Sequence, residues 1–204
     1  MKNKGVLVVI SGFSGSGKGT LIKALLERYP NYALSVSCTT RKPRTGEAEG
    51  RDYYFVSEEE FRRMIETGEL IEYASYCGRY YGTPRAYVEK RMEEGQDVLL
   101  EIEIQGALQI KKKFPDTVLI FVTPPSAAEL KRRLTGRGTE TEEVIAARLH
   151  RAAEEADGME QYDYLLINDE LDACCATLHQ IIQCQHHRAF LHREEIAALC
   201  GELK

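Results

Sequence analysis

A glycine-rich segment near the start of the chain has the composition of a phosphate-binding loop. It consists of Gly12, Phe13, Ser14, Gly15, Ser16, Gly17 and Lys18, and it fits the pattern G-x-x-x-x-G-K. Glycines let a turn direct its backbone N–H groups at phosphate oxygens, and the lysine that ends the pattern reaches the terminal phosphates. An ordinary glycine-rich turn has no need of that lysine. The segment therefore predicts a nucleoside triphosphate site.

The two residues after Lys18 depart from the general pattern. Gly19 stands where Ser or Thr usually follows the lysine, and Thr20 comes next, so no side-chain hydroxyl occupies the usual metal position. This ending is similar to that of adenylate kinases. We expect both residues to contact the nucleotide. Mg²⁺ would be held mainly by nucleotide oxygens and water, which suits its reluctance to dehydrate, and no protein ligand to it is assigned.

Apolar runs predict the elements that position this loop. A β-branched run at 6–10 precedes the glycines, and apolar residues at helical spacing follow them at 21–26. Similar strand-like runs occur at 98–102, 118–122 and 164–167, with a shorter one at 34–36. Helix signals lie between them: Pro84 after Thr83 with Gly95 beyond the end, and Ser126 with Glu129 as a capping box. This alternation predicts an α/β fold, with a parallel sheet flanked by helices as in P-loop NTPases.

Two segments interrupt this alternation. Residues 35–95 hold most of the tyrosines and an Arg/Lys cluster at 41–44, and we interpret them as an inserted small domain. Residues 135–157 form a charged stretch with few large apolar side chains, which predicts a mobile lid. The core nucleotide-binding domain would then consist of residues 1–34, 96–134 and 158–204.

Ordered motifs through the rest of the chain resemble the guanylate kinase family. They are SVSCTTRKPRTGE from residue 35, GRDYYF from 50, LIEY from 70, YYGT from 80, EIQG from 103, PPS from 124, GRGT from 136 and IND from 167. The resemblance covers roughly residues 5 to 185. It implies a three-part kinase that transfers the γ-phosphoryl group of ATP to GMP, and to dGMP, in purine nucleotide metabolism.

The resemblance also implies a binding site for the GMP phosphate. The matching residues are Arg41, Arg44, Tyr53 and Tyr81. Two guanidinium groups and two phenolic hydroxyls suit a dianion. The alternative is a solvated basic loop, but an acidic protein that clusters Arg and Tyr in one insert favours the site.

Guanine recognition is assigned by the same resemblance to Glu72. A carboxylate accepts from both N1–H and the 2-amino group of guanine, whereas adenine offers no such pair of donors. Ser37 and Thr83 match positions that contact the nucleotide, and Thr83 could also cap a helix. Glu101 and Glu103 alternate along an expected strand, near the metal and the acceptor nucleoside respectively; the family usually has Asp at both positions.

Several arginines match residues that close over the transferring phosphoryl group. They are Arg133, Arg137 and Arg148. With Lys18 and Arg41 they form the expected catalytic set, which stabilises charge and needs no general base. Asn168 is similar to the residue beside the donor adenine. Arg151 is not assigned to the catalytic set, because ion pairs on the surface of a helix explain an arginine at this position equally well.

Composition limits the other classes of function. The chain has 204 residues with a formal net charge of −5, which argues against nucleic-acid or membrane-surface partners. Six cysteines without a C-x-x-C pair, and no secretory signal, predict a reduced cytoplasmic protein. The helical pattern at 171–204 could cover the core or pair with another subunit, so the oligomeric state, monomer or homo-oligomer, stays open.

Two alternative functions fit parts of the sequence. Non-catalytic guanylate-kinase-like scaffolding modules usually lack an intact phosphate loop, so residues 12–18 argue against that class. An adenylate kinase is suggested by Lys18, Gly19 and Thr20. Glu72 and the run at 37–44 oppose an adenine-specific site.

Overall fold

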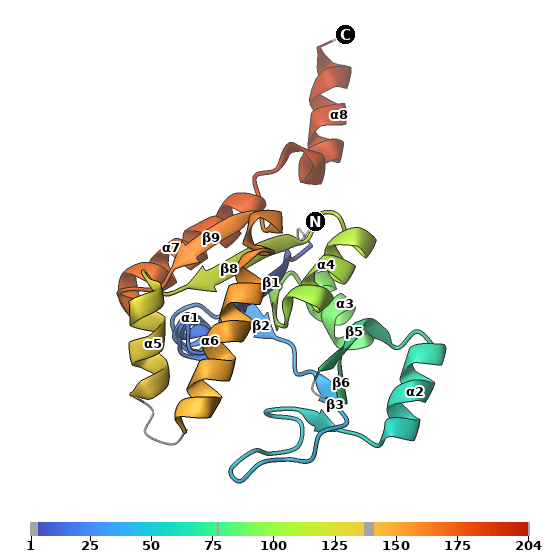
Figure 1. The fold of residues 1–204 in the computed structure, drawn as a ribbon. Helices are drawn as coiled ribbons and strands as arrows, with labels where there is room; N and C mark the ends of the chain where they lie inside the picture. The colour runs from blue at the N-terminus through green and yellow to red at the C-terminus, as the bar shows by residue number, and fades with distance from the viewer. Residues whose placement is uncertain (1–3, 77, 137–140, 204) are drawn as a thin grey trace.

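The apolar runs of the sequence form a parallel sheet at the centre of the fold (Figure 1). The computed structural model describes residues 4–76, 78–136 and 141–203. The strands of this sheet are β1 (Leu7–Gly12), β2 (Tyr32–Leu34), β7 (Asp97–Glu101), β8 (Val118–Thr123) and β9 (Tyr164–Ile167). Their order is β2-β7-β1-β8-β9, and every pairing is parallel. The predicted strands are confirmed, except that the short one expected at 34–36 ends at Leu34.

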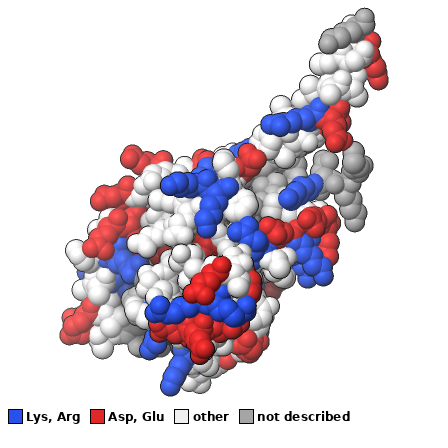
Figure 2. Space-filling view, turned by 90° about the vertical axis from the view of Figure 1, so that its right-hand side faces the viewer, with Lys and Arg blue, Asp and Glu red and all other residues white. Residues whose placement is uncertain are grey.

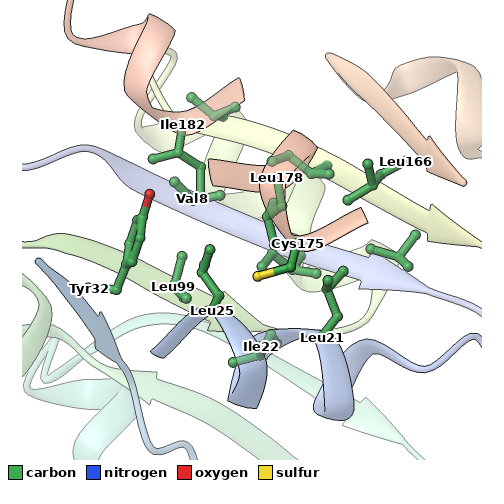
Figure 3. Packing of buried hydrophobic residues seen from close by; sticks show 14 of the residues in the cluster. Val8, Leu21, Ile22, Leu25, Tyr32, Leu99, Leu166, Cys175, Leu178 and Ile182 are labelled. Atoms are coloured by element: carbon green, nitrogen blue, oxygen red, sulfur yellow. The ribbon is translucent and has the colours of Figure 1, made fainter. Parts of the chain in front are cut away.

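Helices cover both faces of the sheet, because each face is apolar. Figure 3 shows α1 (Lys18–Arg28) and α7 (Leu171–Gln185) packed on one face, around Val8 and Leu99. The other face packs against α3 (Arg85–Glu93) and α4 (Ile104–Lys113). Successive residues of β1 divide between the two clusters, with Val8 and Ile10 on one side and Leu7 and Val9 on the other. This packing fixes β1, which leads into the phosphate-binding loop.

A smaller sheet lies between β2 and β7 in the chain. Its strands are β3 (Cys38–Thr39), β4 (Tyr54–Phe55), β5 (Leu70–Tyr76) and β6 (Arg79–Pro84), in the order β4-β3-β6-β5. The amphipathic helix α2 (Glu58–Glu66) packs Phe61 and Met64 against it. Charged pairs such as Arg62 with Glu58 line the outer side of α2, and Figure 2 shows both signs of charge interspersed on this side of the molecule.

The helices α5 (Ala127–Thr135) and α6 (Glu142–Ala156) pack together beside the phosphate-binding loop. The predicted capping box is confirmed, since Ser126 Oγ accepts the N–H of Glu129 at 3.1 Å. The expectation that the 135–157 segment has little apolar area to hold it is wrong for α6. Ile145 and Ala152 are buried in one cluster with Phe13.

The C-terminal helical pattern divides into two helices. After α7 the chain passes through the short 3₁₀ helix η2 (Ala189–His192) into α8 (Arg193–Glu202); another, η1 (Met159–Gln161), precedes β9. No residue of α8 is buried, and the helix stands out from the body (Figures 1 and 2). Among the described residues, no helix is both long and apolar enough to cross a membrane.

Candidate active site

The glycine-rich segment forms a tight turn between β1 and α1. Gly12, Gly15 and Gly17 have φ angles of 150°, 90° and 89°, which other residues rarely adopt. Space is restricted as well: a Cβ atom on Gly12 would lie 2.0 Å from the carbonyl oxygen of Val122, and one on Gly17 would lie 2.5 Å from Nδ2 of Asn168. The path of the loop therefore requires glycine at these positions.

Two side chains from distant parts of the chain hold this loop. Asn168, buried after β9, donates from Nδ2 to the carbonyl oxygen of Ser16 at 2.8 Å. Arg133 donates from Nη1 to the same oxygen at 3.3 Å. Because a trans peptide directs its C=O and N–H to opposite sides, fixing the Ser16 carbonyl directs the N–H of Gly17 away from both donors. Asn168 thus supports the loop, and its contact with adenine stays a prediction.

Cationic side chains meet at the loop from two helices. Lys18 opens α1, and its Nζ donates to the carbonyl oxygens of Gly12 at 2.6 Å and Phe13 at 3.1 Å. Arg148 of α6 donates from Nη1 to Ser14 Oγ at 2.9 Å. The structure therefore brings a predicted lid arginine to the predicted phosphate-binding loop.

The remaining lid residues are placed less completely. Arg133 is held by Glu129 Oε1 at 2.7 Å, which orients it toward the loop. Arg137 lies outside the described residues. Arg151 pairs with Glu155 at 2.9 Å, as the surface interpretation expects, but its Nη2 also lies 3.9 Å from Glu103. Nothing in the sequence indicated the contact between Arg151 and Glu103, because an ion pair at helical spacing was a sufficient reason for an arginine at position 151.

Glu101 and Glu103 do not share a strand, so that prediction is wrong. β7 ends at Glu101, and Glu103 is the N-cap of α4. The chain leaves the sheet between them, where the carbonyl oxygen of Ile102 accepts a hydrogen bond from Ser11 Oγ at 2.7 Å. Desolvation raises the pKa of both carboxyl groups, and the positive charge of Lys18 opposes the rise. Both therefore still lie within the electrostatic influence of Lys18.

The insert gathers three of the four residues predicted to bind the GMP phosphate. The guanidinium carbon of Arg41 lies 5.1 Å from the ring centre of Tyr53, and the rings of Tyr53 and Tyr81 are 6.0 Å apart. Glu47 is the main cause of the raised pKa of Arg41, and Tyr81 contributes to it. Two phenols and a guanidinium thus converge, which is a donor set suited to a phosphate.

Arg44 and Ser37 are held through their backbones. The backbone N–H of Arg44 donates to Glu47 Oε2 at 2.8 Å, and Arg44 itself is exposed. The carbonyl oxygen of Ser37 accepts the N–H of Tyr54 at 2.9 Å. These are backbone contacts, so the roles of both side chains stay predictions.

Glu72 and Thr83 form a buried polar pair between β5 and β6. Glu72 is 3% exposed and Thr83 fully buried, and Thr83 Oγ1 donates to Glu72 Oε1 at 2.7 Å. Burial raises the pKa of Glu72 to about 7, while Thr83 and the more distant Lys113 oppose this. The expected N-cap role of Thr83 is wrong: Pro84 is the N-cap of α3, and the hydroxyl of Thr83 serves Glu72.

Glu101 interacts electrostatically with both the insert and the phosphate-binding loop. Its negative charge contributes to the raised pKa of Tyr53 in the insert, although desolvation is the larger cause, and it is itself influenced by Lys18 of the loop. A pocket of about 390 Å³ adjoins it and the first turn of α1, where Gly19 is exposed. Within the described residues, no three His, Cys, Asp or Glu side chains form a metal-binding cluster. The carboxylate of Glu101, which lines this pocket with Gly19, fits a divalent ion that keeps mainly phosphate and water ligands.

Comparison with known proteins decides the family. A sequence model of guanylate kinase matches residues 4–185. The chain belongs to the guanylate kinase family. Guanylate kinases of similar sequence include that of Lactococcus lactis, 50% identical over 92% of both chains. Another, from Bacillus cereus, is 50% identical over 98% of this chain and 96% of its own.

Solved structures agree with this assignment. The crystal structure of guanylate kinase from Anaplasma phagocytophilum superimposes with a TM-score of 0.75 at 38% identity, covering 92% of this chain and 89% of that one. The predicted α/β fold of the P-loop type is thereby confirmed. The protein is a nucleoside monophosphate kinase of the guanylate kinase family.

Proposed function

We propose that this guanylate kinase transfers the γ-phosphoryl group of ATP to GMP, and to dGMP, with release of ADP. The observation that carries the proposal is the pairing of a buried carboxyl group, Glu72, with a phosphate-type donor set in one insert. A carboxylate reads the N1–H and 2-amino donors of guanine, and the donor set holds the 5′-phosphate. The two lie on neighbouring strands or beside them, as one bound mononucleotide requires.

The acceptor site uses residues of the insert and its boundary with the core. Arg41, Arg44, Tyr53 and Tyr81 are proposed to bind the phosphate, and Ser37, Glu72, Thr83 and Glu103 to contact the nucleoside. Glu101 lies at the junction. The phosphate of GMP needs cationic or hydroxyl donors, and the insert supplies both within one cluster.

The donor site is proposed to be the glycine-rich loop. Residues 12–20 would surround the polyphosphate of ATP with backbone N–H groups and the Lys18 ammonium, and Asn168 would lie beside the adenine. Mg²⁺ is the proposed metal; when bound, it neutralises charge on the β- and γ-phosphate oxygens. Glu101 would lie near the metal, as the family resemblance implies, and no residue is assigned as its direct ligand.

Catalysis is proposed to depend on position and charge. An oxygen of the GMP phosphate is already anionic, so no residue needs to remove a proton before it attacks the γ-phosphorus. Lys18, Arg41, Arg133, Arg137 and Arg148 would stabilise the charge that spreads over the transferring group. We propose that the 35–95 insert and the 135–157 lid close around the substrates, which excludes water.

The proposed setting is the cytoplasm. The described cysteines are all free thiols, as is usual in reducing compartments, and ATP and GMP are the proposed partners. The phosphate loop ends as in adenylate kinases, but a buried carboxyl group at the base site favours guanine.

A coupled assay of ADP release tests the proposal. The purified protein would be offered GMP, dGMP, AMP, CMP and UMP in turn, each with ATP and Mg²⁺. We expect turnover with GMP and dGMP only. Preferred turnover of AMP would overturn the assignment of guanine to Glu72.

A further inference from the structure

A carboxylate in the insert grips the arginine that is assigned to the GMP phosphate. Glu47 accepts two parallel hydrogen bonds from Arg41, from Nη1 to Oε2 and from Nη2 to Oε1, each 2.9 Å long. Both side chains are largely shielded from solvent, with exposed fractions of 15% for Arg41 and 20% for Glu47. Such two-pronged pairing fixes the plane and the direction of a guanidinium group.

The remaining surface of the guanidinium is directed at the phosphate-binding tyrosines. Of its five N–H groups, two bond to Glu47 and a third donates from Nη1 to the carbonyl oxygen of Lys42 at 2.9 Å. The guanidinium carbon lies 5.1 Å from the ring centre of Tyr53, whose ring is in turn 6.0 Å from that of Tyr81. Glu47 therefore holds one edge of the Arg41 guanidinium group. The other edge remains available for the proposed ligand, the phosphate of GMP.

Glu47 also closes the loop that carries Arg41. Its Oε2 accepts the backbone N–H of Arg44 at 2.8 Å, and its own N–H donates to the carbonyl oxygen of Arg44 at 3.1 Å. The hydrogen bonds that the carboxylate accepts, first from Arg41 and then from the Arg44 N–H, lower the pKa of Glu47 to about 2. The carboxylate is consequently ionised at any pH used for assay.

We propose that Glu47 is a positioning residue for the acceptor phosphate: it presets Arg41 and the 41–47 loop in the geometry that receives GMP. The inference rests on the proposed function, in which Arg41 binds that phosphate. Simple electrostatics predicts the opposite effect of Glu47, because a negative charge near a dianion weakens its binding. If Glu47 acts by positioning, removing its charge weakens the binding of GMP. If it acts only by repulsion, removing its charge strengthens that binding.

The test is Glu47→Gln in the full-length enzyme. The amide keeps one acceptor oxygen but turns an NH₂ group toward the donors of Arg41, so the two-pronged pairing is lost. We expect KM for GMP to rise about tenfold or more, the worth of one charged hydrogen bond, with KM for ATP unchanged. Glu47→Asp keeps the charge on a shorter side chain, so its KM for GMP should lie between those of Glu47→Gln and the parent.

A matched control is available in the same loop. Asp52 accepts the backbone N–H of Ala48 at 2.8 Å and the Nε of Arg51 at 2.9 Å, but Arg51 is not assigned to the site. Asp52→Asn removes the same charge from the same kind of contacts and should leave KM for GMP within about twofold. Melting temperatures of all variants check that the insert stays folded.

Two further measurements separate positioning from general damage. Binding of guanosine, which lacks the phosphate, should be unchanged in Glu47→Gln, whereas binding of GMP weakens. In an Arg41→Met background, Glu47→Gln should raise KM for GMP by less than it does in the parent, because only its bond to the Arg44 N–H remains to be lost.

The outcomes distinguish this inference from the function on which it rests. A lower or unchanged KM for GMP in Glu47→Gln, or an equal loss of guanosine binding, overturns the positioning role. If Arg41→Met itself leaves KM for GMP unchanged, the proposed phosphate site is at fault instead.

Discussion

Glu72 links the stability of the protein to pH, and the consequence can be measured. Glu72 is 3% exposed, and burial raises its pKa from 4.5 to about 7. The folded protein therefore holds this proton more tightly than the unfolded chain does, so ionisation of Glu72 opposes folding. Glu72→Gln removes the ionisable group and retains an oxygen that can accept the hydrogen bond of Thr83. We expect this variant to be more stable than its parent.

The stability gain should increase with pH in a defined window. The parent loses stability as the pH rises from the unfolded pKa toward the folded pKa, and the loss is complete above the folded value near 7. The linkage gives a gain for Glu72→Gln of about 1 kcal/mol at about pH 5 and about 3 kcal/mol at about pH 8. For a chain of this size, the larger gain corresponds to a rise in Tm of roughly 6 to 12 °C.

Urea unfolding of the two proteins without nucleotide, at both pH values, measures this difference. Glu66→Gln is a suitable control, because Glu66 is exposed on α2 and the substitution should give no pH-dependent gain. If the gain of Glu72→Gln were the same at both pH values, the argument from burial of the carboxylate would be refuted.

The same substitution should damage catalysis while it stabilises the fold. Bound guanine needs two acceptors, and the amide turns a donor toward its N–H groups. The loss of a charged hydrogen bond, about 1.5 to 3 kcal/mol, implies a fall of about 10- to 150-fold in kcat/KM for GMP. If Glu72→Gln is stabilised but its kcat/KM for GMP equals that of the parent, guanine must be recognised by other residues.

Four other substitutions test the remaining parts of the site. Lys18→Ala should abolish most turnover and leave the protein folded, because a loop lysine is rarely a packing residue; normal turnover with an unchanged melting temperature would dismiss the loop as the ATP site. Arg137→Ala and Arg148→Ala should each lower kcat about a hundredfold with a smaller rise in KM, whereas normal kcat with a slightly lower melting temperature would indicate surface ion pairs. Gly106→Ala places a Cβ atom 2.7 Å from Glu72 Oε2, so KM for GMP should rise and KM for ATP should not; an unchanged KM for GMP would show that the carboxyl group can move without loss of guanine.

The phosphate-binding loop and the positions of the core strands along the chain could be predicted from the sequence because their causes are local. Positive φ angles at Gly12, Gly15 and Gly17 restrict those positions to glycine. Apolar runs of strand length make a parallel sheet covered on both faces. The bond from the Glu129 N–H to Ser126 spans three residues, so its spacing is visible in the chain. The resemblance to guanylate kinases added the assignment of roles, residue by residue.

Contacts between distant segments could not be predicted in this way. Asn168 bonds to a carbonyl oxygen 152 positions earlier, and nothing near residue 168 indicates that partner. Whether Glu103 is a strand residue or a cap residue is decided by where β7 ends, and the carbonyl oxygen just beyond that end, of Ile102, bonds to Ser11, 91 positions earlier. The C-terminal pattern did not show that the helix would divide, because the apolar residues of α8 satisfy helical spacing without being buried.

The pKa of Glu72 shows most clearly what the sequence determines and what the tertiary structure determines. The sequence determined that a carboxyl group stands at this position, and the family resemblance assigned it to guanine. Only the tertiary structure decided that β5, β6 and α4 enclose it, since a Cβ on Gly106 would lie 2.7 Å from its oxygen. Desolvation depends on every atom around a group, and those atoms come from segments that are far apart in the chain. Residue type therefore follows from the sequence, and the free energy of ionisation follows from the fold.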